Sequence, residues 1–251
     1  MSTRTQAPPG LHGSSDGGVL EQRLFEGIPA RIVLSPIAAP SILGLFGFAG
    51  ATLIVAAHMA GWYGDSGTPQ YLFPFAAMFG GLAQFAAGLF AYRARDGLAT
   101  AMHGMWGAFW LGYGILYALF ATGALTEPTG TFPALGFWFI ALAAITMMGA
   151  FASAFESLAL FAVLGTLTTG AAIAAAAELS GSGTATTVAG WVLVFAAGFA
   201  WYTASAMMLA ESAGRVILPL GKLSKAANVP GAQPTEPVQY SRGMPGVKAG
   251  Q

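Results

Sequence analysis

The chain has 251 residues, of which 55% are apolar and only 8% are charged, and its formal net charge is zero. Because an average soluble domain carries about a quarter charged residues, this chain has too few charges to cover a water-exposed surface. The composition therefore predicts a polytopic membrane protein and excludes a soluble enzyme. The zero net charge argues against a nucleic-acid partner, and the absence of cysteine excludes disulfides and thiolate metal sites.

The first 35 residues form a polar N-terminal tail without an apolar stretch typical of a cleavable signal peptide. Within this tail, the apolar residues of segment 20–34 are spaced for a short amphipathic helix lying on the membrane. A tail packed on the protein is the alternative for this segment. At the other end, residues 222–251 are rich in Pro, Gly, Lys and Gln, a composition that predicts a disordered cytoplasmic tail.

Between the tails, residues 36–221 are predicted to form an all-α membrane domain of six transmembrane helices. Each apolar segment has 20 or more residues, which is enough to cross a hydrocarbon core about 30 Å thick. The fourth break is placed at Glu156, the only charge in a run too long for one helix. The predicted segments cover about 39–62, 71–93, 98–121, 132–154, 157–178 and 185–210.

The basic residues predict the orientation of these helices. All ten Lys and Arg residues fall in the two tails or in the loop between the second and third segments, which six spans place on one side. The opposite side has no basic residue and carries Asp65, Glu127 and Glu178. By the positive-inside rule, both termini are cytoplasmic and the chain lies in the cytoplasmic (inner) membrane.

The predicted spans contain few groups that could support chemistry. Away from their ends they have no Asp, Glu, Lys or Arg, which excludes a retinal Schiff base and leaves no recognisable catalytic residue, metal site or cofactor. The titratable side chains at depth are His58 and His103. Gln84 is a primary amide in mid-span, so it either bridges to a neighbouring helix or lines a pore as a hydrogen-bond donor.

Two predicted helices carry a face that mixes polar and aromatic side chains. In the first segment Ser41, Gly44, Phe48 and Thr52 share a face, and glycines there and in the second segment allow close helix approach. This pattern indicates either packing alone or the wall of a narrow conduit for a small, partly polar solute. The third segment has ring-bearing side chains at spacings of three and four residues, namely His103, Trp106, Trp110, Tyr113 and Tyr117.

These segments resemble the YaaH/SatP-type acetate uptake transporter family, with motifs in order from about residue 35 to 221. The start of the first segment is similar to the signature Asn-Pro-Ala-Pro-Leu-Gly-Leu, and His58 with Gly61 is similar to Leu-His-Asn-x-Gly at the end of that helix. The runs Gly-Gly-Leu-Ala-Gln at 80–84 and Gly-Ala-Phe-Trp-Leu at 107–111 match two further family motifs. Near the end, Gly-Arg and Leu-Pro-Leu-Gly within 214–221 match the closing motif.

The resemblance implies a helical-bundle protomer with its own pore, assembled in the lipid bilayer as a homo-oligomer, a hexamer. It implies transport of acetate, and of succinate or other short-chain acids, through a constriction at Phe48, Trp106 and Leu164. His58, the titratable group in the matched motifs, is the candidate for coupling transport to protons. The first-helix motif and the donors that a carboxylate needs give the expected substrate-binding residues Pro40, Ser41, Leu43, Gly44, Leu45, Thr52 and Gln84.

The chain also departs from the family and is expected to be a divergent member. The asparagine of the signature is Ala39, its second proline is Ile42, and the tyrosine of the third-segment motif is Trp106. The larger Trp106 ring predicts a tighter opening beside Phe48 unless Gly165 supplies space. Two alternative functions stay open: a non-transporting structural or sensory membrane oligomer, and a conduit for a neutral small solute.

Overall fold

The structure is a computed structural model that describes residues 32–34, 37–223 and 238–240. The described residues fall into two units, one formed by the helices and the other containing two short strands. Strands β1 (Ile32–Leu34) and β2 (Val238–Tyr240) pair in antiparallel fashion, as their β-branched residues favour. Residues 32–34 are therefore not the end of an amphipathic helix. The rest of segment 20–34 lies outside the described residues, as does most of the tail expected to be disordered.

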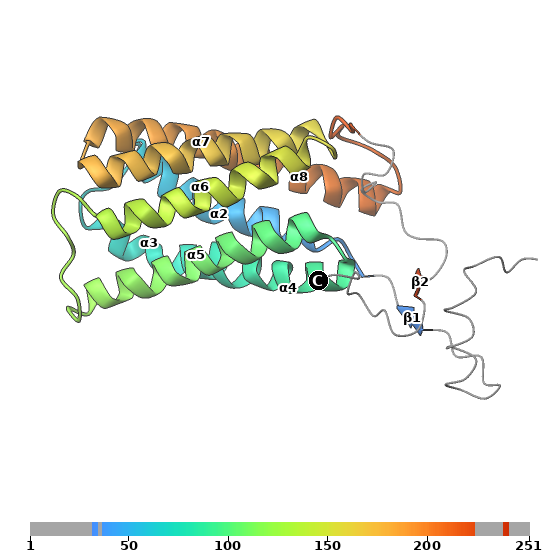
Figure 1. Ribbon diagram of the computed structural model, residues 1–251, viewed down its shortest axis with the longest axis horizontal. Coiled ribbons are helices and arrows are strands. Elements are labelled where there is room, and N and C mark those ends of the chain that lie inside the picture. Colours follow the sequence, from blue (N-terminus) through green and yellow to red (C-terminus); the bar gives the residue numbers. More distant parts are fainter. Residues whose placement is uncertain (1–31, 35–36, 224–237, 241–251) are drawn as a thin grey trace, which may run out of the picture. The chain divides into compact units, whose positions relative to one another are not determined.

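The six membrane-spanning helices expected from the sequence are confirmed, and their bounds lie close to the expected ones (Figure 1). The break at Glu156 falls where it was expected, between the fourth and fifth spans. The second span is divided into three parts, α3, η1 and α4, which run without interruption. The elements are α2 (Pro40–Met59), α3 (Thr68–Ala76), η1 (Ala77–Ala83), α4 (Gln84–Ala94), α5 (Gly97–Ala121), α6 (Pro133–Ser153), α7 (Leu158–Ser180) and α8 (Gly183–Ala213).

Local sequence explains where several of these helices begin. Pro40 and Pro133 stand in the first turn of α2 and α6, where the fixed φ of proline suits a helix and its missing N–H leaves no bond unmade. The Asp96 side chain accepts a hydrogen bond of 2.8 Å from the N–H of Ala99 and so caps α5. Ser157 caps α7 in the same way. The two capping side chains fix where α5 and α7 begin, and residues near both helix starts line the cavity described below.

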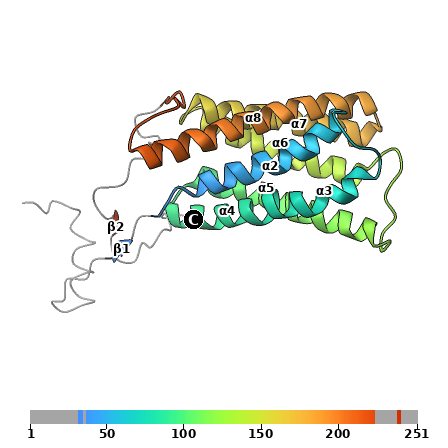
Figure 2. The same cartoon turned by 180° about the vertical axis from the view of Figure 1, so that it is seen from behind.

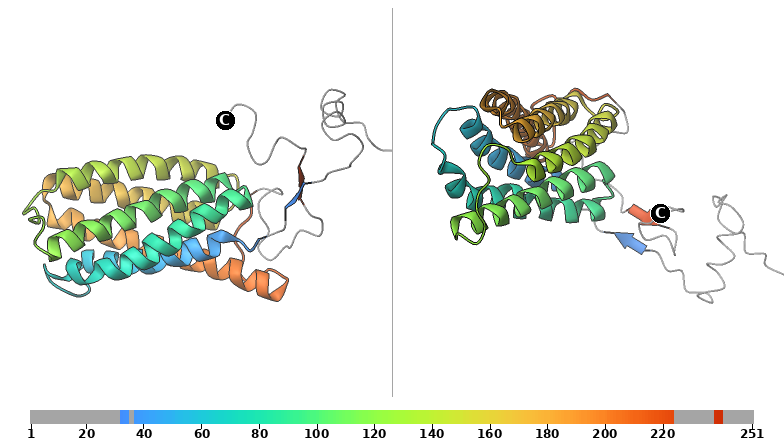
Figure 3. Two further views of the ribbon diagram at one scale, coloured as in Figure 1. Left: turned by 90° about the horizontal axis from the view of Figure 1, so that it is seen from below. Right: turned by 60° about the vertical axis from the view of Figure 1, so that its left-hand side comes forward.

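Helix α2 occupies the middle of the bundle. It packs against α8 on one side and against α3, η1, α4 and α5 on the other, while α6, α7 and α8 pack in succession. Figure 2 shows α2 between these two groups from behind, and Figure 3 shows the bundle from two further directions. The buried core therefore extends along α2, with α5, α7 and α8 facing it.

The second span contains a π-helix, which the sequence analysis did not predict. Pro74 lies inside α3, where it removes a backbone donor, and the wide turns of η1 follow directly. The backbone carbonyl of Phe79 in this segment lies so close to Gly47 of α2 that a Cβ at Gly47 would overlap it. The π-helix ends at Ala83, directly before Gln84, so it sets the direction in which this amide leaves the helix.

Candidate functional site

A cavity of about 90 Å³ lies inside the helical unit, at the end of the bundle where α2, α5 and α7 begin and α8 ends. Its wall is mostly apolar and is supplied by these helices and by Gln84 of α4. Asp96, Glu156 and Lys222 line its mouth, in the connections α4–α5 and α6–α7 and in the segment after α8. The cavity is therefore a vestibule that leads from one end of the bundle toward its centre.

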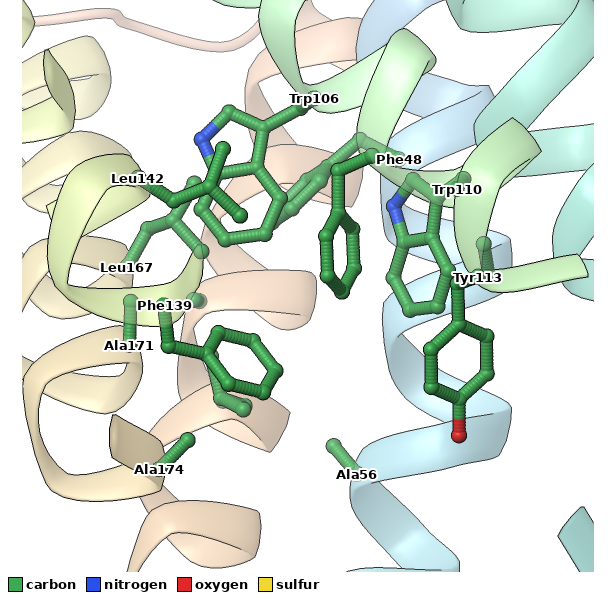
Figure 4. Close-up of a cluster of buried hydrophobic side chains, with 14 of the residues drawn as sticks. Phe48, Ala56, Trp106, Trp110, Tyr113, Phe139, Leu142, Leu167, Ala171 and Ala174 are labelled. Carbon is green, nitrogen blue, oxygen red and sulfur yellow. The ribbon is translucent and has the colours of Figure 1, made fainter. Parts of the chain in front are cut away.

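Three large side chains that line this cavity are Phe48, Trp106 and Leu164, the residues that the sequence analysis named for the constriction. They are only 2%, 3% and 4% exposed. The rings of Phe48 and Trp106 meet edge to face, with centroids 6.1 Å apart and planes at 71°. In Figure 4 the Trp106 ring lies between Leu142 and Phe48, so aromatic and aliphatic groups from different helices meet at one point.

Trp106 is held in place by a hydrogen bond that it donates to the neighbouring helix α6. Its indole Nε1–H donates to Oγ1 of Thr146 over 2.9 Å, and the Thr146 hydroxyl donates to the Leu142 carbonyl oxygen over 2.7 Å. Gly165 does not make room for this ring: among the described residues, no heavy atom across the packing lies within 4 Å of the point where its Cβ would stand. Trp106 turns toward α6 instead.

Polar side chains line the cavity between its mouth and the constriction. They are Ser41 of α2, Gln84 of α4, His103 of α5 and Thr203 of α8. Gln84 and His103 are 3% and 5% exposed, and Gln84 Oε1 and His103 Nδ1 have no hydrogen-bond partner among the described residues. The other polar atom of each side chain, Nε2, can donate a hydrogen bond, so Gln84 and His103 are donors that a ligand in this cavity would meet.

The structure separates the expected substrate-binding residues into two groups. Ser41, Leu45 and Gln84 line the cavity. Leu43 does not, because it is 50% exposed on the outer surface of α2. The other three expected residues do not line the cavity either. Pro40 begins α2, and Gly44 packs against the His103 ring. Thr52 is buried, and its Oγ1 has no hydrogen-bond partner among the described residues.

His58 lies far along α2 from the cavity, since Ser41 is at the start of that helix and His58 is in its last turn. Its Nδ1 is 3.1 Å from the carbonyl oxygen of Tyr63, and the Tyr63 hydroxyl donates to the Ile54 carbonyl oxygen. His58 is half-buried at the opposite end of the bundle. The structure thus does not bring it together with Phe48 and Trp106.

The mouth of the cavity is shaped by the segment that follows α8. Backbone N–H groups of Leu158 and Ala159, in the first turn of α7, donate to the carbonyl oxygens of Gly221 and Leu220 over 2.8 and 3.0 Å. This segment thereby holds Lys222 beside Glu156. Burial, and secondarily the negative charge of Asp96, raises the pKa of the Glu156 carboxyl above its usual value of 4.5.

The sequence analysis did not place His103, Thr203 or the mouth residues in the site. His103 carried a usable signal, because it begins the stripe that contains Trp106 and is one turn of helix before it. The others carried none, since Glu156 and Lys222 meet only through the fold of the chain after α8. The interior face of α5 was thus visible in the sequence, while the mouth was not.

Comparisons with known proteins agree with this arrangement. The sequence profile of the GPR1/FUN34/yaaH family matches residues 25–225, which confirms the resemblance seen in the motifs. The succinate-acetate/proton symporter SatP of Escherichia coli K12 is 27% identical over 188 residues, which cover 74% of this chain and 96% of that protein. An uncharacterized protein of Methanothermobacter thermautotrophicus is 28% identical over 209 residues, covering 75% and 93%.

The fold has a counterpart among solved structures. The structure of the bacterial acetate channel SatP superposes with a TM-score of 0.68 at 26% sequence identity. The match covers 74% of this chain and 100% of that chain. The six-helix unit is therefore the part that is shared with it.

Proposed function

Because the chain belongs to the GPR1/FUN34/yaaH family, we propose that each protomer conducts small carboxylates, acetate first among them, across the cytoplasmic membrane. The path begins at the cavity mouth and passes between Phe48, Trp106 and Leu164. The observation that carries this proposal is that polar side chains with hydrogen-bond donors and the large side chains of Phe48, Trp106 and Leu164 line one cavity. The SatP proteins named above, one a symporter and one a channel for such acids, support the substrate class.

The chemistry of the cavity suits a carboxylate that must move on. Ser41, Gln84 and His103 offer neutral hydrogen-bond donors, and the spans contain no Lys or Arg away from their ends. A buried cation would hold the anion tightly, because charge attraction is strong where water is excluded. Neutral donors bind it weakly, and the apolar constriction then admits the methyl or methylene part of the acid. Conduction needs this balance of modest binding and easy release.

Three further features are part of the proposal. Both termini face the cytoplasm, which makes the cavity mouth the cytoplasmic one and places His58 near the outer surface. His58 is the group we assign to proton coupling, since histidine is the side chain most often used as a proton carrier in proteins. Protomers assemble as a homo-oligomer, a hexamer, for which the exposed apolar side chains along α3, η1 and α4 offer a surface.

Uptake of labelled acetate by proteoliposomes that contain the purified protein tests the proposal. Uptake above that of empty liposomes, saturable and competed by other short-chain acids, is the expected result. Folded protein that conducts no acetate would favour a structural or sensory oligomer. Flux of neutral solutes such as ammonia, without an acetate-dependent current or uptake, would favour the neutral-solute alternative.

A further inference from the structure

Among the polar residues of the cavity, His103 is a buried histidine with one ring nitrogen that has no hydrogen-bond partner among the described residues. The side chain is only 5% exposed, and it lines the cavity. Its Nδ1 faces no solvent and has no hydrogen-bond partner within the part of the chain that the structure describes. The ring lies flat enough on Gly44 that a Cβ at that position would stand 2.5 Å from Nδ1. Packing against Gly44 thus fixes the ring and seals one of its two nitrogens.

The sealed nitrogen determines what the ring offers to the cavity. A buried N–H without an acceptor is more costly than a bare ring nitrogen, so the proton of neutral His103 belongs on Nε2. Asp96, Glu156 and Lys222 are the other titratable groups that line the same cavity, and they lie at its mouth. The neutral ring presents one N–H donor to whatever occupies the cavity.

The position of this donor relative to Gln84 follows from helix α2. Gly44 packs against the His103 ring, and the Cβ position of Gly47 is 3.4 Å from the Gln84 backbone N. Three residues along a helix correspond to about 4.5 Å, so the His103 ring and the Gln84 backbone meet α2 about one turn apart. Because α2 begins at the end of the bundle where the cavity opens, Gln84 meets α2 farther inside than His103 does. This spacing is comparable with that of two carboxylates joined by two methylene groups.

We propose that His103 determines specificity by holding the second carboxylate of a short dicarboxylate while Gln84 holds the first. This inference rests on the proposed function and assigns a substrate class to the same cavity. A monocarboxylate occupies only one of the two donors at a time, whereas a four-carbon diacid occupies both. The donor pair therefore raises the flux of the diacid relative to that of acetate.

Transport of succinate and acetate by three variants tests the role of His103, at about pH 7, where both carboxyl groups are ionised. His103→Phe keeps a ring on Gly44 and removes the donor, and it should lower the succinate-to-acetate flux ratio about tenfold, the usual effect of losing a hydrogen bond to a charged group. His103→Asn keeps a donor and should retain most of the ratio. Met105→Phe, on the exposed side of the same helix, is the control and should leave the ratio unchanged.

An unchanged ratio in folded His103→Phe protein would overturn the inference. Wild-type protein that conducts acetate but not succinate would also overturn it, while leaving the proposed function intact. Wild-type protein that conducts neither would reject the proposed function itself. A second measurement on the wild type needs no variant: succinate, with two methylene groups, should inhibit acetate uptake more strongly than malonate, which has one. Equal inhibition by both diacids would contradict the spacing of the two donors.

Discussion

The indole of Trp106 donates a hydrogen bond of 2.9 Å to the hydroxyl of Thr146, and both side chains are buried. The bond crosses from α5 to α6 and so fixes the angle at which Trp106 meets Phe48. A tryptophan without this partner would keep its size but lose its orientation. The orientation of Trp106 therefore depends on α6, a helix that supplies none of the three residues proposed for the constriction.

Thr146→Val removes the acceptor while it preserves the shape of the side chain. The stranded indole N–H should lower the free energy of unfolding by about 1–3 kcal/mol, and the freed ring should admit bulkier acids. We expect the butyrate-to-acetate flux ratio to rise and the midpoint of thermal unfolding to fall. Thr146→Ser, which keeps the hydroxyl, serves as the control. If Thr146→Val matched the wild type in both measurements, the hydrogen bond would have no part in setting the constriction.

The raised pKa of Glu156 predicts how acetate flux responds to pH on the side of the membrane where the cavity opens. Burial raises its pKa, so the carboxylate is neutralised as pH falls through a value above 4.5, and the mouth then repels anions less. Acetate flux should increase as the pH on that side decreases. Glu156→Gln should raise flux near neutral pH and flatten this dependence. A profile unaltered by Glu156→Gln would exclude the carboxylate as the source of the pH response.

His58 makes a separate prediction, because it lies at the other end of α2. If protons are taken up there, His58→Gln should abolish the dependence of acetate uptake on external pH and leave the dependence on internal pH intact. Glutamine retains hydrogen-bonding ability but does not titrate. Uptake by proteoliposomes with independently buffered inner and outer solutions measures both. An unchanged external profile would show that His58 only supports Tyr63.

The contact between α4 and α5 depends on a glycine. A Cβ at Gly88 would stand 2.7 Å from the backbone N of Gly104, so even alanine does not fit without separating the helices. Gly88→Ala should lower the thermal unfolding midpoint and broaden the size-exclusion profile. Gly198→Ala is the matched control, because no described atom across the packing approaches its Cβ position within 4 Å. Similar stability of the two variants would contradict this account of the close approach.

Much of the fold followed from simple properties of the sequence. Apolar length fixed the number of spans, and Pro, Gly and capping residues fixed their ends, so the helices lie close to their predicted bounds. The residues proposed for the constriction were chosen from motif positions, because the family motifs occur in order along the chain, and the structure places all three on one cavity. Leu43 was included only because it belongs to a motif. Leu43 is two residues from Leu45, so on a helix the two side chains point in different directions. Helical periodicity alone would therefore have excluded Leu43 from the expected substrate-binding residues.

The features that could not be predicted depend on contacts between distant segments. The π-helix begins shortly after Pro74, and the carbonyl of Phe79 within it lies against Gly47 of α2. The unusual state of His103 exists only because Gly44, from another helix, seals its Nδ1. The cavity mouth requires the chain after α8 to return to Leu158. No local pattern encodes such meetings, since each residue involved is ordinary in its own segment.

The central claim, that small carboxylates pass between Phe48, Trp106 and Leu164, is tested most directly at Trp106. We predict that well-folded Trp106→Ala protein in proteoliposomes conducts acetate with a higher succinate-to-acetate flux ratio than the wild type, because the removed ring widens the path. Trp106→Tyr should retain acetate flux close to that of the wild type. A ratio in folded Trp106→Ala protein that equals the wild-type ratio would contradict the claim, because the solute would then pass elsewhere.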